Sequence, residues 1–214
     1  MKILSIHVGR PREIPWEGKT VLTSIFKHPV PGPVAVRATN LDGDEQSDLS
    51  VHGGKAKAVY VYPSEHYAWW RRELPGVDFT WGVFGENLTV TGLLETAVHV
   101  GDRLRAGSAE FVVTQPRMPC YKLGIRFNDP GMVQRFQDSG RNGFYLAVEQ
   151  EGSVRVGDSI EIMARDPHGM SVALVAELYT SQHADPELLQ RVSELPALPE
   201  RWRERFRARV PRVS

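Results

Sequence analysis

The sequence predicts a mainly β fold, a barrel or sandwich with peripheral helices, followed by a small three-helix domain. From Lys2 to about Ala164, short alternating or β-branched runs recur between glycines and prolines, which is typical of strands and tight turns. Beyond that point apolar residues take the 3.6-residue spacing of amphipathic helices. A chain of 214 residues has room for one ordinary domain and a small second one. We therefore expect domains at residues 1–165 and 166–214.

The expected strands share β-branched or aromatic residues and end at turn-forming residues. They are "ILSIHV" (3–8), "VLTSIF" (21–26), "VAVRATNL" (34–41), "ENLTV" (86–90), "RLRA" (103–106), "AEFVVTQ" (109–115), "GFYLAVEQ" (143–150) and "SIEIM" (159–163). The "AGS" step at 106–108 predicts a hairpin, and "EQEGSV" at 149–154 predicts another turn. So many short strands in one segment favour a barrel or a sandwich.

Two helices are expected within the β region. The first covers about 64–74 between two prolines, and Tyr67, Trp70 and Leu74 are spaced to share one face. The second should begin with Asp129 as the N-cap and Pro130 in the first turn, and end at Gly140.

Three amphipathic helices are expected after residue 170. Their apolar faces are Val172, Val175, Ala176 and Tyr179; then Leu188, Leu189, Val192 and Leu195 after Asp185 and Pro186; then Trp202, Phe206 and Val210. Three short helices do not bury a face alone, so they should pack together and on the barrel.

The charge balance and the cysteine count exclude several classes of function. Lysine plus arginine equals aspartate plus glutamate, at 26 each, so no net field selects nucleic acid or a membrane, and we expect neither as a partner. Cys120 is the single cysteine, which excludes an internal disulfide, a four-cysteine metal site and a CxxC redox pair. The sequence shows no signal peptide or membrane-length apolar run, so we expect a cytoplasmic protein. Its oligomeric state stays open, with an oligomer allowed.

A glycine turn at residues 52–57, "HGGKAK", is the first candidate for chemistry. Gly53 and Gly54 let backbone N–H groups approach an anion, with His52 before them and Lys57 after them. An ordinary turn between strands explains the glycines equally well, so both interpretations stand.

A proline-stiffened segment, "QPRMPCYKL" at 115–123, is the second candidate. Its prolines favour an extended backbone that presents Arg117 and Cys120. Flanking cations increase the thiolate fraction of a cysteine, and the thiolate is the nucleophile and metal ligand. The alternative is a buried cysteine that acts as a small apolar residue. A third segment, "FGENLTV" at 84–90, offers Gly85 and Asn87 either to a site or to a bulge before a strand.

Taken together and in this order, these segments resemble the MOSC family, named for the C-terminal domain of molybdenum cofactor sulfurase. The resemblance runs through "GDEQSDLSVHGG", "KAVYVYPSEHYAWW", "FGENLTVTGLLE", "VGDRLRAG" and "QPRMPCYKL". The C-terminal tail is similar to the three-helix domain of the stand-alone bacterial YiiM-like subgroup, so the resemblance covers nearly the whole chain.

That resemblance implies a β-barrel related to the one inserted in pyruvate kinase, and a molybdenum–pterin cofactor with Cys120 as metal ligand. It also implies roles for His52, Gly53 and Gly54. The family usually writes "HGGxDKA", so this chain has Ala56 in place of the acid and retains Lys57. Cofactor contacts by Arg117, Gly85 and Asn87 follow from motif position. A dithiolene-bound metal accepts one soft thiolate from the protein, so a single cysteine suffices.

The function expected from this resemblance is a molybdenum-dependent reductase of N-hydroxylated compounds such as hydroxylaminopurines, in which Cys120 and His52 are catalytic. Electrons would come from a separate donor, such as a flavoprotein. The alternative is a carrier of the cofactor or of sulfur, with a Cys120 persulfide and no reductase activity. A pyridoxal phosphate enzyme with Lys57 as the Schiff base is a third interpretation.

Overall fold

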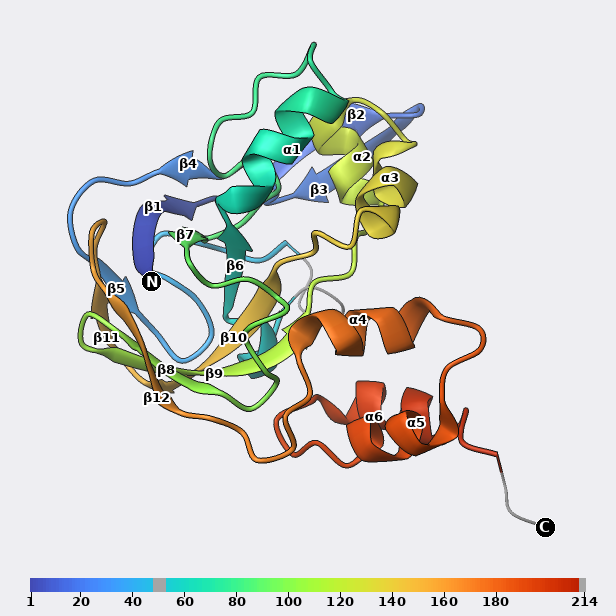
Figure 1. Ribbon diagram of the computed structural model, residues 1–214. Helices are drawn as coiled ribbons and strands as arrows, with labels where there is room; N and C mark the ends of the chain where they lie inside the picture. Colours follow the sequence, from blue (N-terminus) through green and yellow to red (C-terminus); the bar gives the residue numbers. More distant parts are fainter. Residues whose placement is uncertain (48–52, 212–214) are drawn as a thin grey trace.

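The computed structural model describes residues 1–47 and 53–211 and shows a β-rich body beside a helical domain at the C-terminal end (Figure 1). The main sheet has eight strands in the order β12-β8-β9-β10-β6-β7-β1-β4. These strands are β1 (Lys2–Val8), β4 (His28–Pro29), β6 (Val59–Pro63), β7 (Leu88–Thr91), β8 (Arg103–Ala106), β9 (Ala109–Pro116), β10 (Phe144–Gln150) and β12 (Ile160–Ala164). Two small sheets pair β2 (Arg12–Trp16) with β3 (Lys19–Thr23), and β5 (Val34–Val36) with β11 (Gly152–Val154).

The main sheet curls until its two ends meet near the start of the chain. β1 pairs with β7, while Lys2 forms a bridge to Ser159, just before β12. Backbone hydrogen bonds from Ile3 to Asp158 and from Ile160 to Met1, each 3.0 Å, continue this contact. Closure of this kind removes most of the unpaired sheet edge. The expected barrel is therefore confirmed.

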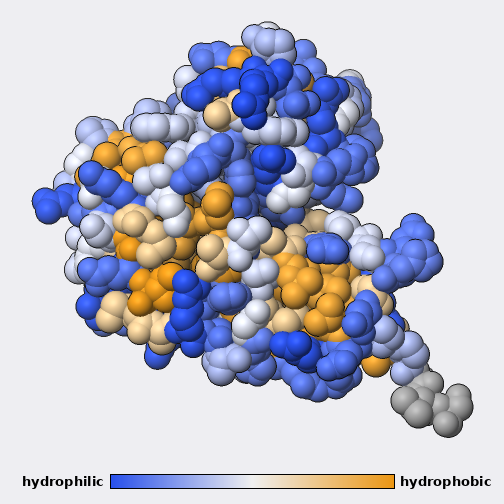
Figure 2. All heavy atoms as spheres, viewed as in Figure 1, coloured by the Kyte–Doolittle hydropathy of each residue, from blue (hydrophilic) through white to orange (hydrophobic). Residues whose placement is uncertain are grey.

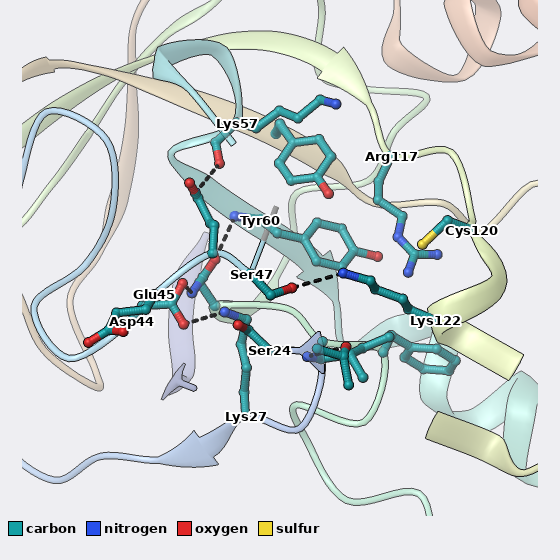
Figure 3. Close-up of a pocket in the computed structure, with 17 residues that line it drawn as sticks. Ser24, Lys27, Asp44, Glu45, Ser47, Lys57, Tyr60, Arg117, Cys120 and Lys122 are labelled. Carbon is teal, nitrogen blue, oxygen red and sulfur yellow. Dashed lines mark hydrogen bonds and ion pairs between the residues drawn. The ribbon is translucent and has the colours of Figure 1, made fainter. Parts of the chain in front are cut away.

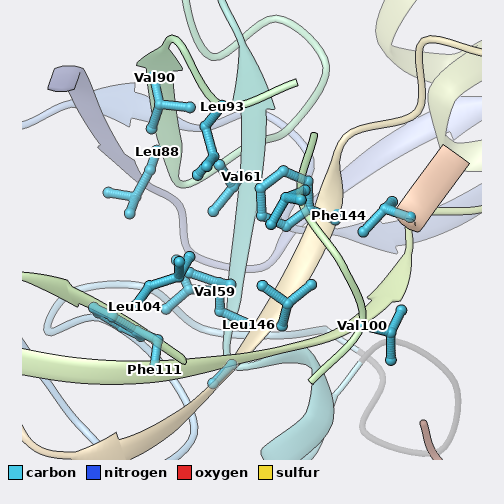
Figure 4. Packing of buried hydrophobic residues seen from close by; sticks show 14 of the residues in the cluster. Val59, Val61, Leu88, Val90, Leu93, Val100, Leu104, Phe111, Phe144 and Leu146 are labelled. Atoms are coloured by element: carbon cyan, nitrogen blue, oxygen red, sulfur yellow. The ribbon is translucent and has the colours of Figure 1, made fainter. Parts of the chain in front are cut away.

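The barrel interior is filled by apolar side chains that point inward from neighbouring strands (Figure 4). Val59 and Val61 come from β6, Phe144 and Leu146 from β10, and Phe111 from β9, and all five are at most 3% exposed. Full burial of such side chains is the main favourable contribution to folding. This interior holds the strands that carry the candidate site in fixed positions.

A second, aromatic cluster lies at the end of the barrel beneath three helices. These are α1 (Glu65–Glu73), α2 (Tyr121–Phe127) and α3 (Met132–Asp138). Trp70 and Phe136 stack at 5.8 Å between ring centroids, and Phe84 packs on Tyr62 at 4.6 Å. Trp70 Nε1 donates a 2.7 Å hydrogen bond to the Tyr62 hydroxyl, which satisfies both polar groups inside the cluster.

The C-terminal domain consists of α4 (Val172–Thr180), α5 (Pro186–Ser193) and α6 (Glu200–Arg207). Asp185 caps α5 by accepting the Glu187 N–H at 2.8 Å, with Pro186 in the first turn, as expected. Val172 and Val175 of α4 are fully buried in the same apolar cluster as the barrel core. Apolar side chains gather over both the helices and the lower barrel on the face seen in Figure 2. The expected domain boundary between residues 165 and 166 stays a prediction.

Several elements differ from expectation. Strand β6 and helix α2 were not expected, and "VAVRATNL" forms a strand only at Val34–Val36. Asp129 as the N-cap of the second helix was wrong: the helix α3 starts at Met132 with Gly131 as its cap, and Asp129 instead accepts the Gly131 N–H in a local turn. The "AGS" hairpin joins β8 and β9 as expected, whereas the "EQEGSV" segment ends β10 and forms β11 (Gly152–Val154), which pairs with β5. Propensity and turn chemistry do not specify such long-range pairings.

None of the helices in residues 1–47 and 53–211 combines the length and the apolar character that crossing a bilayer would require.

Candidate functional site

An open cavity lies where β6, β9 and β10 meet the loop after β5 and the start of α2 (Figure 3). Its walls carry charged, hydroxyl and aromatic groups together. The lining residues used below are Ser24, Lys27, Asp44, Ser47, Lys57, Tyr60, Gly85, Asn87, Arg117, Cys120, Lys122 and Tyr145. These cations thus come from three separate segments, so only the folded chain brings them together.

The chain around Cys120 is held at both ends. Strand β9 ends at Pro116, and the Arg117 N–H donates to the Gly143 carbonyl at 3.2 Å. Cys120 is extended, with φ −131° and ψ 170°, and its carbonyl accepts the Leu123 N–H at 2.9 Å as α2 begins. Cys120 is half-buried. The predicted stiff arm is therefore a short extended link between a strand and a helix, with the thiol at the cavity wall.

Arg117 lies beside Cys120 at the edge of the aromatic cluster (Figure 3). Its side chain is 5% exposed, and its guanidinium carbon lies 4.8 Å from the Phe136 ring centroid and 5.5 Å from that of Tyr60. Within the residues that the structure describes, its Nη1 atom has no hydrogen-bond partner. A buried cationic N–H without an acceptor is costly, so this group is suited to an anionic or carbonyl oxygen of a ligand.

Lys57 is positioned by a short 3-10 helix, η1 (Lys55–Lys57), that follows the glycine turn. Ala56 accepts a 2.7 Å hydrogen bond from the Thr114 hydroxyl through its carbonyl, which fixes η1 against β9. Burial lowers the pKa of Lys57, and the nearby charge of Arg201 lowers it further. The Lys57 ammonium lies 6.0 Å from the Tyr145 ring centroid, on the rim of the cavity.

Asn87 anchors the opposite wall of the cavity. Its side-chain carbonyl accepts the Tyr60 N–H at 3.0 Å, and its amide donates to the His7 carbonyl at 3.2 Å and to Asp44 at 2.9 Å. Asp44 also pairs with Lys27, whose pKa is lowered by burial despite that partner. Asn87 thus reaches the cavity, as expected for a site residue, but its polar atoms are bonded within the protein.

The glycines of the site have separate backbone roles. Gly85 has φ +82°, and a Cβ there would lie 2.8 Å from Ile25, so a side chain would press on the cavity wall. Gly54 has φ +93° and caps η1. Gly53 lines a neighbouring groove instead of the cavity. His52, the expected proton carrier, lies outside the described residues.

That neighbouring groove runs between the barrel and α6. It shares Lys57, Cys120 and Tyr145 with the cavity, so the thiol stands where the two spaces meet. The structure therefore brings Cys120, Lys57, Arg117, Gly85 and Asn87 around one space, with Gly53 on the adjoining one.

The residues around the thiol fit a metal held largely by an organic cofactor. In residues 1–47 and 53–211 no cluster of three His, Cys, Asp or Glu side chains is placed to hold a metal ion. A metal at Cys120 would thus take its other ligands mainly from a bound molecule, and a thiolate suits a soft metal centre. Arg117 Nη1 and the Ser24 hydroxyl both line the cavity without a hydrogen-bond partner among the described residues, and both are donors for such a molecule.

Several site residues were not found from the sequence. Lys122, only 7% exposed, donates a 2.8 Å hydrogen bond to Ser47 across the cavity. Tyr60 and Tyr145 pack their rings at 5.3 Å and form its floor. The sequence predicted Lys122 only as a cation near the thiol, and the helix α2, which begins one residue after Cys120, turns its side chain into the cavity. The tyrosines lie on β6 and β10. The sequence pattern around them is that of ordinary strand residues, so it does not indicate a site.

The chain matches two families in succession. The MOSC domain family matches residues 48–161, and the YiiM-like 3-alpha helix domain family matches residues 170–211. A Bacillus subtilis protein, YflK, is 38% identical over 99% of this chain and 95% of its own length. Escherichia coli YiiM is 38% identical over 76% of this chain and 72% of its own length.

A reductase of Gibberella moniliformis is 32% identical over 91% of this chain, which corresponds to 35% of that longer protein. The crystal structure of YiiM from Geobacillus stearothermophilus superposes with a TM-score of 0.82 at 35% identity, covering 98% of this chain and 99% of that one. The similarity therefore includes both the β-rich body and the three helices.

Proposed function

The chain belongs to the MOSC domain family and carries a YiiM-like three-helix domain, and from this premise we propose that it binds a molybdenum–pterin cofactor through Cys120 and reduces N-hydroxylated compounds to amines. The observation that carries the proposal is a half-buried thiol at the junction of two spaces, beside a buried arginine with an unpartnered N–H among the described residues. The Gibberella relative named a reductase supports redox chemistry.

Binding of the cofactor is assigned to three side chains in this proposal. The Cys120 thiolate would ligate the metal, while Arg117 and Lys122 would bind anionic oxygens of the cofactor from the inner cavity. Both cations are nearly buried, so their attraction for an anion is weakly screened by solvent. Gly85 keeps the wall near Ile25 free of a side chain.

The reaction breaks the N–O bond of an N–OH group, consumes two electrons and two protons, and releases an amine and water. When bound, the cofactor would supply the two-electron redox chemistry. Its reducing equivalents would come from a separate electron-donor protein. His52 is the proposed proton carrier, and Lys57, on the cavity rim, holds positive charge near the Cys120 thiol.

The direct test compares the molybdenum content of wild-type protein with that of Cys120→Ser, both produced in cells that synthesise the cofactor. We expect the variant to lose most of its molybdenum and to keep its thermal unfolding midpoint, because oxygen is a harder ligand and the substitution is nearly isosteric. Met163→Ala, which changes an exposed sulfur-containing side chain on β12, is the control and should retain the metal. Equal molybdenum in Cys120→Ser and wild type would refute the ligand assignment.

Turnover separates the reductase from a carrier of cofactor or sulfur. Cofactor-loaded protein with an artificial electron donor should reduce N-hydroxylated compounds, and His52→Ala should slow turnover without loss of molybdenum. A loaded protein that reduces no N-hydroxylated compound would instead support the carrier with a Cys120 persulfide.

A further inference from the structure

The groove between the barrel and the three-helix domain is a second space that reaches Cys120. Its volume of about 680 Å³ is in the range of small-molecule sites. The outer wall is formed by α4 and α6 through Tyr179, Arg201, Trp202 and Arg205. The proposed cofactor contacts in the inner cavity use none of these four residues.

The groove is rich in positive charge. Lys57, Arg201 and Arg205 line it, against Glu204 as its one lining carboxylate among the described residues. Arg201 is exposed and has no ion pair within that part of the chain. Its charge contributes to the lowered pKa of Lys57 on the opposite wall, so the two cations are close enough to repel each other. An anion between them would remove that repulsion.

The same wall also offers an aromatic surface. The Tyr179 and Trp202 rings pack at 4.3 Å between centroids, and the Arg205 guanidinium carbon lies 4.2 Å from the Tyr179 ring centroid. Tyr179 is half-buried, and Met118 lines the groove from the barrel side. Trp202 is only 8% exposed, so the accessible part of this wall is Tyr179 with the exposed Arg205. A planar heterocycle can stack there, since aromatic and guanidinium planes both favour it.

Cys120 therefore lies between two cationic regions. Arg117 and Lys122 lie in the inner cavity, and Lys57 and Arg201 face the outer groove. A cofactor that is held at Cys120 and extends inward leaves the outer region to another molecule, and that region opens on the thiol.

We infer that this interdomain groove binds the substrate, and that the substrate is a planar N-hydroxylated heterocycle carrying a phosphate group, a nucleotide in preference to the nucleoside that lacks the phosphate. The phosphate lies between Lys57 and Arg201, and the ring lies against Tyr179 and the Arg205 guanidinium. The reactive N–OH group then reaches the junction at Cys120. Reduction of the bound substrate rests on the proposed function, whereas binding of the nucleotide in the groove does not require the cofactor.

Binding is measured by titration calorimetry on the full chain with adenosine 5′-monophosphate and with adenosine as unreactive probes. We expect the nucleotide to bind about tenfold more tightly than adenosine, as charge-assisted contacts to a phosphate predict. Arg201→Gln should remove this preference, and Ala56→Asp should reduce it by placing a carboxylate in the groove. Arg207→Gln is the control, because Arg207 lies on the same helix, pairs with Glu200 and does not line the groove.

The ring contact has its own variant. Tyr179→Leu keeps apolar volume but removes the ring, so it should weaken the nucleotide and adenosine by a similar factor, about fivefold or more. Unchanged unfolding midpoints for all four variants show that binding, and not folding, is affected.

Three results would overturn the inference: equal affinity for the two probes, a nucleotide preference that survives Arg201→Gln, or a loss of molybdenum content in Arg201→Gln. The last result would assign the outer cations to the cofactor. Failure of the proposed function would give another result. The protein would then bind the nucleotide but would reduce no N-hydroxylated compound. If only the groove assignment fails, a small N-hydroxylated compound without ring or phosphate is still reduced.

Discussion

Asp44 shows how a single buried carboxylate organises one wall of the cavity. It is 2% exposed and accepts the Gly9 N–H at 2.8 Å and the Asn87 amide at 2.9 Å, in addition to its ion pair with Lys27. Three segments that are distant in the sequence therefore meet at one side chain. The sequence does not indicate this role, because the partners of Asp44 are too distant along the chain to be connected with it.

Asp44→Asn should destabilise the protein by about 3 kcal/mol, because it leaves the Lys27 charge buried without a counter-charge. Asp42→Asn, at an exposed pair with Arg37, is the matched control and should leave stability unchanged within error. Urea unfolding of both variants measures the difference. A similar small effect for both would show that the Lys27–Asp44 pair contributes little.

His7 gives a pH dependence whose sign follows from its burial. The side chain is 1% exposed, and burial lowers its pKa below 6.5. Between that lowered pKa and 6.5 the unfolded chain binds more protons, so the contribution is fully present above about pH 6.5 and is lost as the pH falls.

His7→Gln should therefore unfold with a weaker pH dependence than wild type between pH 7.5 and 5.5. Denaturant midpoints across that range provide the measurement. Parallel pH profiles for the two proteins would contradict the assignment of this dependence to His7.

At the scale of elements, the turn before β10 sets the position of the Cys120 arm. Gly143 has φ +63°, donates to buried Glu95 at 2.7 Å, and accepts the Arg117 N–H. A Cβ there would lie 2.4 Å from the Val61 carbonyl, so no side chain fits. Sequence alternation predicted β10 itself, but this close approach depends on β6, which was not expected from the sequence.

Gly143→Ala should cost about 3 kcal/mol or more, since a left-handed residue and a backbone clash act together. Gly140→Ala is the control, because Gly140 has a similar φ of +65° but open space around it, and should cost about 1 kcal/mol. Guanidinium unfolding compares the two. Equal costs would mean that the chain shifts to accept the new methyl group.

Much of the architecture was accessible from sequence because its signals are local. The strand alternation, the cap at Asp185 and the apolar stripes of α4 to α6 each depend on residues within one or two turns of one another. Each motif indicated its candidate site residues separately. The resemblance to the MOSC family implied that these residues contact the same cofactor. The second groove could not be expected, because Trp202 and Tyr179 read as ordinary core positions until α6 is placed beside the Cys120 arm.

At the scale of the whole molecule, the barrel and the three helices share one apolar cluster. Val172 and Val175 of α4 are fully buried in it, together with Val100 and Phe144 from the barrel side. The distinct segments at 1–165 and 166–214 should therefore unfold in a single cooperative transition.

Val175→Ala should lower the stability of the entire chain by about 2 kcal/mol, through lost burial and a small cavity. Circular dichroism and tryptophan fluorescence should report one shared midpoint in wild type and variant. Val156→Ala, at a half-exposed position, is the control and should shift that midpoint little. Two separated transitions would show that the domains fold independently.

The central claim is that the Cys120 sulfur ligates molybdenum, and X-ray absorption at the molybdenum edge tests it most directly. Cofactor-loaded wild type should show one more sulfur neighbour around the metal than the fraction of Cys120→Ser that still holds the cofactor, with an oxygen neighbour in its place. An identical number of sulfur neighbours in the two proteins would contradict the account.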